Sequence, residues 1–320
     1  RYFYSKTISP KIFSRNIVLL GNTQETEELV STIETIPQLG YKIIIHYPHI
    51  DFGIKNVQNE IRNKDINLVV IPDDININNE SLKILYESIF LNVDFVYFSS
   101  FYEFIIKRIP LSTINENWFL KNISANPNQI NDSIKRVLDV AIASIGFTAS
   151  AIIYPIIILA IKLDSRGPAF ITQKRVGQNN KIFSNIKFRS MFVNDDGKWP
   201  EKNDKRITKV GKFLRKTRLD ELPQLINVIR GDISLVGPRP DIIDLYEKLE
   251  SEIPYYKIRN LIKPGLTGWA QIHQESPPHS VESTKQRLSY DFYYLKNKSL
   301  ILDLMIILRT IKTLLSQKGS

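Results

Sequence analysis

The chain has 320 residues, enough for two domains, and it contains no cysteine, so disulfides and thiolate metal sites are excluded. Its formal net charge of +10 indicates an anionic partner, which is a nucleic acid, an anionic membrane surface or a phosphorylated substrate. The chain opens with Arg1 rather than Met and shows no signal peptide, so we expect that this sequence begins inside a longer protein.

Residues 1–125 alternate short apolar runs with segments of helical periodicity. Strands buried on both faces read as nearly continuous apolar runs, and strands that alternate with helices are typical of a parallel sheet. The sequence therefore predicts an α/β domain over residues 1–125, with a Rossmann-like, doubly wound sheet. Its predicted strands are 16–20, 41–45, 67–71 and 93–98, and its predicted helices are 25–36, 57–62 and 81–90.

The turn after the first predicted strand does not favour a nucleotide. A dinucleotide-binding loop needs three glycines so that its backbone can approach the pyrophosphate. This turn has one glycine, Gly21, and Glu25 would repel a phosphate group. We expect a structural or regulatory role for this domain, ahead of ligand binding.

A polar segment separates this domain from a long uncharged run. Residues 126–133 contain Pro127 and show no periodicity, so they are predicted to be a linker. The run 140–161 carries no charge and is long enough to cross a bilayer core of about 30 Å as a helix. By length alone, a simple transmembrane span is the favoured interpretation.

Two features of this run favour a helix that enters the membrane, bends and returns. Basic residues stand on both flanks, and cationic flanks prefer the cytoplasmic side. Pro155 lies inside the run, where it removes a helical hydrogen bond and favours a kink. We therefore predict a re-entrant membrane helix over residues 134–163. The flanking basic residues are Lys135, Arg136, Lys162, Arg166, Lys174 and Arg175.

A second basic pattern follows the membrane segment. Lys187 and Arg189 alternate around Phe188, so both would project to one face of an extended segment. As a pair they suit phosphate oxygens, and a solvated basic edge is the alternative. The polar segment 194–204 is predicted to be a mobile loop near the active site.

Two adjacent carboxylates, Asp220 and Glu221, stand where a helix is predicted to begin. Thr217 and Asp220 have capping-box spacing, an apolar helical pattern follows, and Gly231 ends it. Neighbouring helical residues point about 100° apart, so the two carboxylates would have separate tasks. One would attack an electrophile while the other holds a metal. The alternative is an acidic first turn that only caps the helix.

Basic residues on both sides of this pair indicate phosphate chemistry. Arginine presents a planar fork of donors that suits phosphate oxygens. Carboxylates beside arginines, with a metal implied, suit phosphoryl transfer, in which positioning and charge neutralisation do most of the catalysis. These basic residues are Arg215, Lys216 and Arg218 before the pair, and Arg239 on a Gly-Pro-Arg-Pro turn after it.

Five segments match the pattern of one known family in order, and together they are far more specific than any one of them. They are 187–191 (KFRSM), 214–217 (LRKT), 219–225 (LDELPQL), 235–240 (LVGPRP) and 263–271 (KPGLTGWAQ). From about Ile134 to its C-terminus the chain thus resembles the bacterial sugar transferases, which are polyprenyl-phosphate glycosyl-1-phosphate transferases. Residues 1–125 look like the Rossmann-like domain that precedes the catalytic domain in the longer members of this family.

The resemblance implies a membrane-associated α/β catalytic domain over residues 164–320, and it implies a reaction. A sugar 1-phosphate passes from a UDP-sugar to polyprenyl (undecaprenyl) phosphate, UMP is released, and exopolysaccharide, capsule, O-antigen or other glycan assembly begins. In the implied mechanism Asp220 attacks phosphorus and forms a phosphosugar intermediate, and Glu221, with Asp220 beside it, holds Mg²⁺. The implied substrate ligands are Lys187, Arg189, Arg215, Arg239 and Asp291.

The resemblance also implies a location and a set of partners. The expected place is the cytoplasmic face of the bacterial inner membrane, in contact with membrane lipid and without nucleic acid. Residues 299–315 form an apolar segment with few charges, which suits a helix in the membrane interface, and packing against the catalytic domain is the alternative. A homo-oligomer stays open, because the sequence does not fix the oligomeric state.

Two other classes of function remain open at this point. A basic nucleic-acid-binding protein would carry aromatic residues interleaved with its basic patch and would need no lipid, and the uncharged run argues against it. A catalytically silent membrane scaffold would use the Rossmann-like domain to bind partners. The intact Asp220–Glu221 pair argues against that second alternative.

Overall fold

In a computed structural model, the chain divides into two compact units, Arg1–Lys121 and Asn122–Ser320. The structure describes residues 14–73, 79–123, 129–192, 206–274, 278 and 280–315. The loop predicted at 194–204 lies outside these residues. Each unit is described by itself below.

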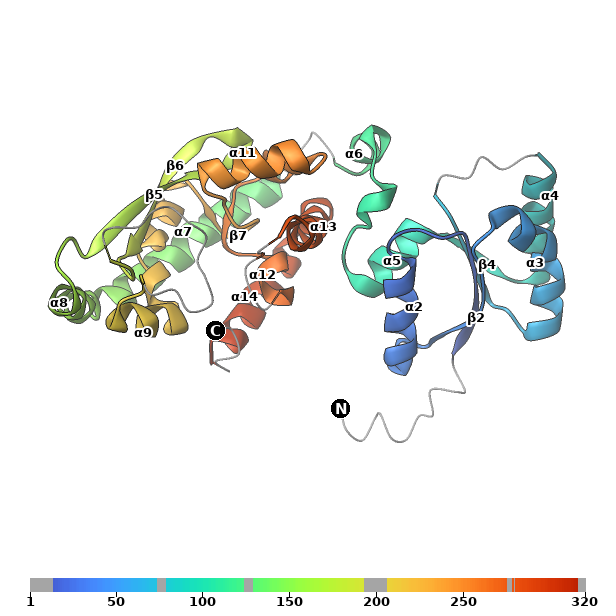
Figure 1. Ribbon diagram of the computed structural model, residues 1–320, viewed down its shortest axis with the longest axis horizontal. Helices are drawn as coiled ribbons and strands as arrows, with labels where there is room; N and C mark the ends of the chain where they lie inside the picture. Colours follow the sequence, from blue (N-terminus) through green and yellow to red (C-terminus); the bar gives the residue numbers. More distant parts are fainter. Residues whose placement is uncertain are drawn as a thin grey trace. The chain divides into compact units, whose positions relative to one another are not determined.

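The N-terminal unit is built on a four-stranded parallel sheet (Figure 1). The order of its strands is β2-β1-β3-β4, which is the start of the 2-1-3-4-5 order found in flavodoxin-like doubly wound sheets. All four predicted strands and their parallel pairing are confirmed. The strands are β1 (Arg15–Leu20), β2 (Tyr41–Tyr47), β3 (Leu68–Ile71) and β4 (Asp94–Tyr97).

Helices cover both faces of this sheet, as Figure 1 shows, because both faces of its strands are apolar. In β1, Ile17 and Leu19 pack into one core, while Val18 and Leu20 pack into the core on the opposite face. This alternation explains why the strand reads as an unbroken apolar run. The covering helices are α2 (Thr26–Thr35) and α5 (Phe98–Ile106) on one face, and α3 (Ile50–Lys64) and α4 (Asn79–Ser88) on the other.

The turn after β1 has contacts that fit a structural role. Gly21 has a φ of +85°, and a Cβ there would lie 2.6 Å from Pro72 Cγ, so glycine is required by the close approach of the chain after β3. Glu25 accepts hydrogen bonds from the backbone N–H and the hydroxyl of Ser112. The short elements of this unit are η1 (Pro37–Leu39), η2 (Ile89–Leu91), η3 (Leu111–Thr113) and α6 (Glu116–Asn122).

The C-terminal unit is mainly helical and contains two small sheets. An antiparallel hairpin joins β5 (Phe170–Val176) to β6 (Ile182–Phe188), and β7 (Ser234–Val236) pairs in parallel with β8 (Gly265–Thr267). The helices are α7 (Gln129–Ala151), α8 (Tyr154–Asp164), η4 (Gln178–Asn180), α9 (Lys209–Thr217), η5 (Leu219–Glu221), α10 (Gln224–Arg230), α11 (Ile243–Glu252), η6 (Tyr256–Leu261), α12 (Trp269–His273), α13 (Val281–Asn297) and α14 (Leu300–Leu315).

The main core of this unit gathers elements from its whole length. Ala143 of α7 and Val228 of α10 are fully buried beside Trp269 of α12 and Ile306 of α14. The C-terminal helix therefore packs on the rest of the C-terminal unit through one face, as the alternative interpretation predicted. Its other face is exposed and apolar, with Ile301, Leu304, Leu308, Ile311 and Leu314 on it.

The predicted membrane segment forms two helices, α7 and α8, that meet at a bend of 60°. Pro155 stands in the first turn of α8, where its missing N–H costs no helical hydrogen bond. Helix α7 begins at Gln129, inside the range predicted as a linker. Among the described helices, none is by itself long and apolar enough to cross a membrane, whereas α7 and α8 together meet that length and composition.

Both ends of this bent pair are fastened to the C-terminal unit. Near the start of α7, Lys135 donates to Asp303 over 2.6 Å, and Arg136 donates to the last carbonyls of α10. Asp139 is buried and accepts from the Ser234 hydroxyl over 2.7 Å. At the end of α8, Asp164 accepts from the Val210 N–H over 2.8 Å.

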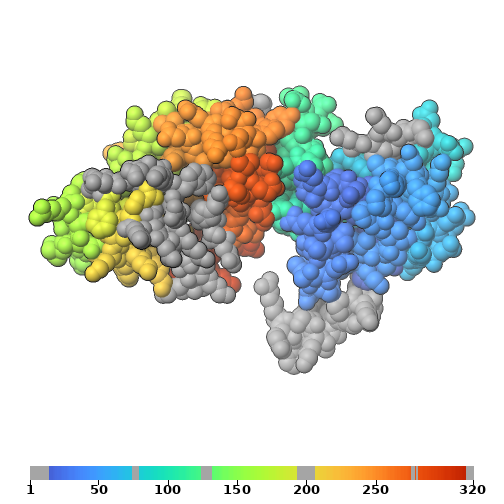
Figure 2. Space-filling model, viewed as in Figure 1, coloured from blue at the N-terminus to red at the C-terminus, as the bar shows by residue number. Residues whose placement is uncertain are grey.

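One face of α8 packs inward and the other is exposed. Ile157 and Ile161 are buried against Phe188 of β6 and Leu214 of α9. The exposed face leaves α8 at the surface of the C-terminal unit, as Figure 2 shows. The exposed apolar residues of the bent pair include Ile142, Ile145, Ile152, Ile156, Leu159 and Leu163.

Candidate active site

The two carboxylates lie in a turn between two helices. Helix α9 ends at Thr217, whose hydroxyl donates to the carbonyls of Phe213 and Leu214. The prediction of one helix that begins with a capping box at Thr217 is therefore wrong. The chain reverses at Arg218, which has a left-handed φ of 57°, and Asp220 then falls in the short 3₁₀ turn η5. Gly231 ends α10 with a φ of 92°, as predicted.

Glu221 accepts hydrogen bonds from two cationic side chains. Its Oε1 accepts from Lys187 Nζ over 2.8 Å and from Arg239 Nη2 over 3.0 Å. Lys187 comes from the end of β6, and Arg239 comes from the Gly-Pro-Arg-Pro turn after β7. Burial by itself would raise the pKa of Glu221, but Lys187 and Arg239 hold that pKa well below its usual value. Glu221 is thus ionised and fixed in place.

Asp220 has the opposite environment. Its side chain is 7% exposed, and Oδ1 has no hydrogen-bond partner among the described residues. Burial, followed by the charge of Glu221, raises the pKa of Asp220 to about 6, although Lys187, Arg218 and Arg215 oppose the shift. A buried carboxylate oxygen without a partner is rare and costly in a folded protein, and such groups cluster at functional sites. Asp220 therefore keeps an unused, electron-rich oxygen at neutral pH.

The carboxylate pair suits a magnesium ion that takes its remaining ligands from a substrate and from water. Within the described ranges, no group of three or more histidine, aspartate or glutamate side chains is placed to hold a metal alone. Magnesium usually takes one or two carboxylates and completes its shell with water and substrate phosphates. The partnerless Oδ1 of Asp220, next to Glu221, is the kind of oxygen donor that such an ion accepts.

A buried network of charges supports the turn that carries Arg239. Arg259 is 1% exposed and donates Nη2 to the Arg239 carbonyl over 2.8 Å. Its other nitrogens bond the carboxylates of Asp241 and Asp291. The structure thus places Asp291, predicted as a substrate ligand, behind the turn at 2% exposure. Its contacts favour a positioning role, and direct contact with substrate stays a prediction.

The other two predicted phosphate ligands lie in different places. Arg189 follows β6 and donates to the carbonyls of Ser165 and Arg166 over 2.7 and 2.8 Å, so it fastens the loop after α8. The structure does not bring Arg189 together with Lys187. Arg215 lies in the last turn of α9, close enough for its charge to lower the pKa of Asp220.

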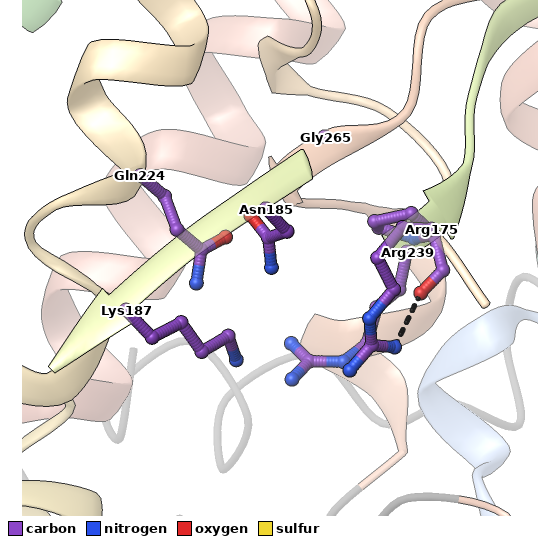
Figure 3. Close-up of a pocket in the computed structure, with 7 residues that line it drawn as sticks. Arg175, Asn185, Lys187, Gln224, Arg239 and Gly265 are labelled. Atoms are coloured by element: carbon purple, nitrogen blue, oxygen red, sulfur yellow. Dashed lines mark hydrogen bonds between the residues drawn. The ribbon is translucent and has the colours of Figure 1, made fainter. Parts of the chain in front are cut away.

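A small pocket that opens to solvent lies beside Glu221, and Figure 3 shows the residues that line it. Lys187 and Arg239 were predicted as ligands, but three polar residues of its lining were not. Of these, Asn185 precedes Lys187 by two positions on β6 and therefore points to the same face. This spacing was the available signal. The complete lining is Arg175, Asn185, Lys187, Gln224, Arg239, Pro240 and Gly265.

A buried carboxylate pair beside converging cations is suited to phosphate chemistry, and comparison with known proteins points in the same direction. The family model described as "Bacterial sugar transferase" matches residues 130–317, which is more than half of the chain. The chain therefore belongs to the bacterial sugar transferase family, and the recognition made from its five segments is confirmed.

Three relatives show how far this similarity extends. The chain is 38% identical, over 67% of its length, to the UDP-N-acetylgalactosamine-undecaprenyl-phosphate N-acetylgalactosaminephosphotransferase of Aeromonas hydrophila. It is 43% identical, over 58% of its length, to the UDP-glucose:undecaprenyl-phosphate glucose-1-phosphate transferase of Klebsiella pneumoniae. The chain spans only 50% and 40% of these two relatives. A sugar transferase of Haemophilus influenzae is 28% identical over 96% of this chain and 70% of its own length.

Proposed function

We propose that this protein transfers a sugar 1-phosphate from a UDP-sugar to undecaprenyl phosphate, with release of UMP, as the first step of glycan assembly. Two of its relatives carry out transfers of this kind according to their names. The observation that carries the proposal is the buried Asp220, whose Oδ1 has no partner among the residues that the structure describes, beside a Glu221 that already holds Lys187 and Arg239.

In the proposed mechanism, Asp220 acts as the nucleophile. Its carboxylate attacks the phosphorus that bears the sugar, the bond from that phosphorus to the bridging oxygen breaks, and UMP leaves with the electron pair. A phosphate oxygen of undecaprenyl phosphate then attacks the same phosphorus, which restores the Asp220 carboxylate and forms the lipid diphosphate sugar. A pKa of about 6 keeps Asp220 mostly ionised at neutral pH.

The cations prepare the donor for this attack. Lys187 and Arg239 lie where they can bind oxygens of the diphosphate, which offsets the repulsion between an anionic nucleophile and an anionic substrate. Glu221, with Asp220 beside it, would hold Mg²⁺, whose charge supplies further neutralisation of the diphosphate. Arg215 adds positive charge on the side of Asp220.

The proposal also includes that α7 and α8 enter the inner membrane from its cytoplasmic face and return to the same face. The start of α7 and the end of α8 are both fastened to the catalytic unit, so both ends of the bent pair belong on one side of a bilayer. The exposed apolar faces of this pair and of α14 supply the surface that enters the lipid. This attachment to the membrane lets a soluble donor and a lipid acceptor both reach Asp220.

Topology is tested with single cysteines in this cysteine-free chain. Ser133→Cys, in the first turns of α7, and Thr172→Cys, on β5 after α8, place exposed thiols at the two ends of the bent pair. We expect both thiols to be protected from an impermeant reagent added outside intact spheroplasts and to react after lysis. Labelling of one site alone from outside would show a true span. Pro155→Leu should shift the segment toward that pattern, because it removes the residue that favours the bend.

The reaction is tested on membranes that contain the protein. They are incubated with Mg²⁺, undecaprenyl phosphate and a panel of radiolabelled UDP-sugars. We expect label from at least one sugar to enter the lipid fraction together with an equal amount of UMP. Membranes with the Asp220→Asn variant are the control. Absence of lipid-linked label with every sugar of the panel would contradict the proposal.

A further inference from the structure

Two amide side chains in the pocket beside Glu221 lack the partners that buried amides normally have. Asn185 is 3% exposed and Gln224 is 5% exposed. Within the described part of the chain, Asn185 Oδ1 and Gln224 Nε2 have no hydrogen-bond partner. Buried polar side chains almost always have at least one partner, so two exceptions in one small pocket call for a ligand.

A neighbouring amide shows what a structural role looks like here. Asn227 lies one turn after Gln224 on α10 and is completely buried. Its Oδ1 accepts from the Ile186 N–H over 3.0 Å, and its Nδ2 donates to Ser184 and Asp232. Asn227 thus ties α10 to β6 through every polar atom. The positions of Asn185 and Gln224 have no such structural explanation.

The same pocket carries an excess of positive charge. Arg175, Lys187 and Arg239 line it, and no carboxylate is among its lining residues. Arg175 donates to the Pro240 carbonyl over 2.9 Å and to Gln173 over 2.6 Å, and its buried Nε has no partner among the described residues. A cluster of cations with unused donors is suited to an anion with several oxygens.

The amides and the cations enclose one space from different sides. In Figure 3, Asn185 and Gln224 lie side by side above the pocket, while Lys187 approaches from β6 and the two arginines approach from the opposite side. A ligand that fills this space meets neutral donors and acceptors on one wall and positive charge on the others. A phosphate group attached to a ring with hydroxyl groups has this distribution.

We propose that the pocket is the donor subsite, in which Arg175 joins Lys187 and Arg239 on the diphosphate while Asn185 and Gln224 bind hydroxyl groups of an attached ring. The proposal rests on the proposed function. Hydroxyl groups both donate and accept hydrogen bonds, so they match an amide acceptor and an amide donor together. The ring is either the transferred sugar or the ribose of the nucleotide, and these two sources are separated by experiment.

The test measures binding without turnover. UDP and UDP-sugar are titrated by calorimetry, with Mg²⁺ held constant, into detergent-purified Asp220→Asn protein that also carries Arg175→Gln, Gln224→Leu or Asn185→Asp. The last change keeps the size of the side chain and places a negative charge beside Lys187. Gln178→Leu and Lys174→Gln are the matched controls, because they remove an amide and a charge that lie outside the pocket lining.

We expect each pocket change to weaken UDP-sugar binding by about 10- to 100-fold, as is usual when a buried hydrogen-bond or charge partner is lost. Arg175→Gln and Asn185→Asp should weaken UDP as well, because both act on the diphosphate. Gln224→Leu should weaken UDP-sugar alone if its ring is the sugar, and both ligands equally if its ring is the ribose. The controls should bind as the parent does.

Two outcomes would overturn the subsite. One is unchanged binding of both ligands in Arg175→Gln, Gln224→Leu and Asn185→Asp proteins whose melting temperatures match the parent. The other is a raised KM for undecaprenyl phosphate alone when the changes are made in the active chain, which would assign the pocket to the acceptor. A protein that binds UDP-sugars in this pocket but transfers nothing would refute the reaction and leave the subsite standing.

Discussion

Replacing Asp220 by asparagine is expected to lower kcat by about 10⁴-fold or more, at every concentration of Mg²⁺, because the variant has no anionic oxygen to attack phosphorus. No covalent phosphosugar should form on the protein. The measurement is turnover with the UDP-sugar that the panel identifies, together with intact-protein mass spectrometry after a single addition of donor.

Replacing Glu221 by glutamine should give a different pattern. The nucleophile stays, but a metal ligand and the anchor of Lys187 and Arg239 are weakened. We expect a loss of about 10- to 1000-fold, part of which returns at high Mg²⁺, since the remaining ligands still position the ion. Glu247→Gln, an exposed change on α11, is the control for loss of one carboxylate. Near-normal turnover in Asp220→Asn would leave the pair without a catalytic role and remove the main support for the enzyme.

The same Asp220→Asn change is expected to stabilise the fold. The folded-state pKa of about 6 lies above the ordinary value of 3.8, so ionised Asp220 costs free energy in the native state. At about 1.36 kcal/mol per pKa unit, removing that charge should raise the free energy of unfolding by roughly 1–3 kcal/mol at pH 7.5. A residue that only capped a helix would instead lose about 0.3–1 kcal/mol on this change.

The stabilisation expected for Asp220→Asn should depend on pH. A raised carboxyl pKa gives stability that is present below the unfolded pKa near 4 and is lost as pH rises through about 6. The wild-type chain loses this contribution over that window, and Asp220→Asn does not. The difference in melting temperature should therefore widen from pH 5 to pH 7.5, measured with EDTA present. A variant that melts below the wild type at pH 7.5 would contradict the burial of an unpaired charge.

Patterns in the sequence were sufficient to predict those elements whose structure follows from local periodicity. The run through Ile17, Val18, Leu19 and Leu20 predicts a strand buried on both faces, and the two separate cores confirm it. The bend at Pro155 was also predictable, because proline is tolerated in the first turn of a helix but not in its interior, so a long helical run breaks just before it. The doubly wound sheet and the break between α7 and α8 could therefore be predicted from local sequence.

The site itself depended on contacts that local patterns do not carry. The helix break before Asp220 comes from a left-handed Arg218, a conformation that is uncommon outside glycine and has no signal in the sequence. Strand β6, which carries Lys187, ends at Phe188. Arg189 lies outside the strand, so the alternation of side chains that predicted a common face for Lys187 and Arg189 does not extend to it. Asp291 is 52 positions beyond Arg239 of the turn that it supports, and only tertiary packing brings them together.

The contact of Glu221 with both Lys187 and Arg239 has a consequence for how the donor is received. Two cations alone in a pocket would repel each other and turn toward solvent. The Glu221 carboxylate holds both cations at one oxygen, and in the proposed mechanism a phosphate of the donor replaces it as their partner. The side-chain entropy needed to gather these cations is therefore lost when the chain folds rather than when the donor arrives. In the proposed mechanism, Glu221 therefore holds both cations in place before the donor binds.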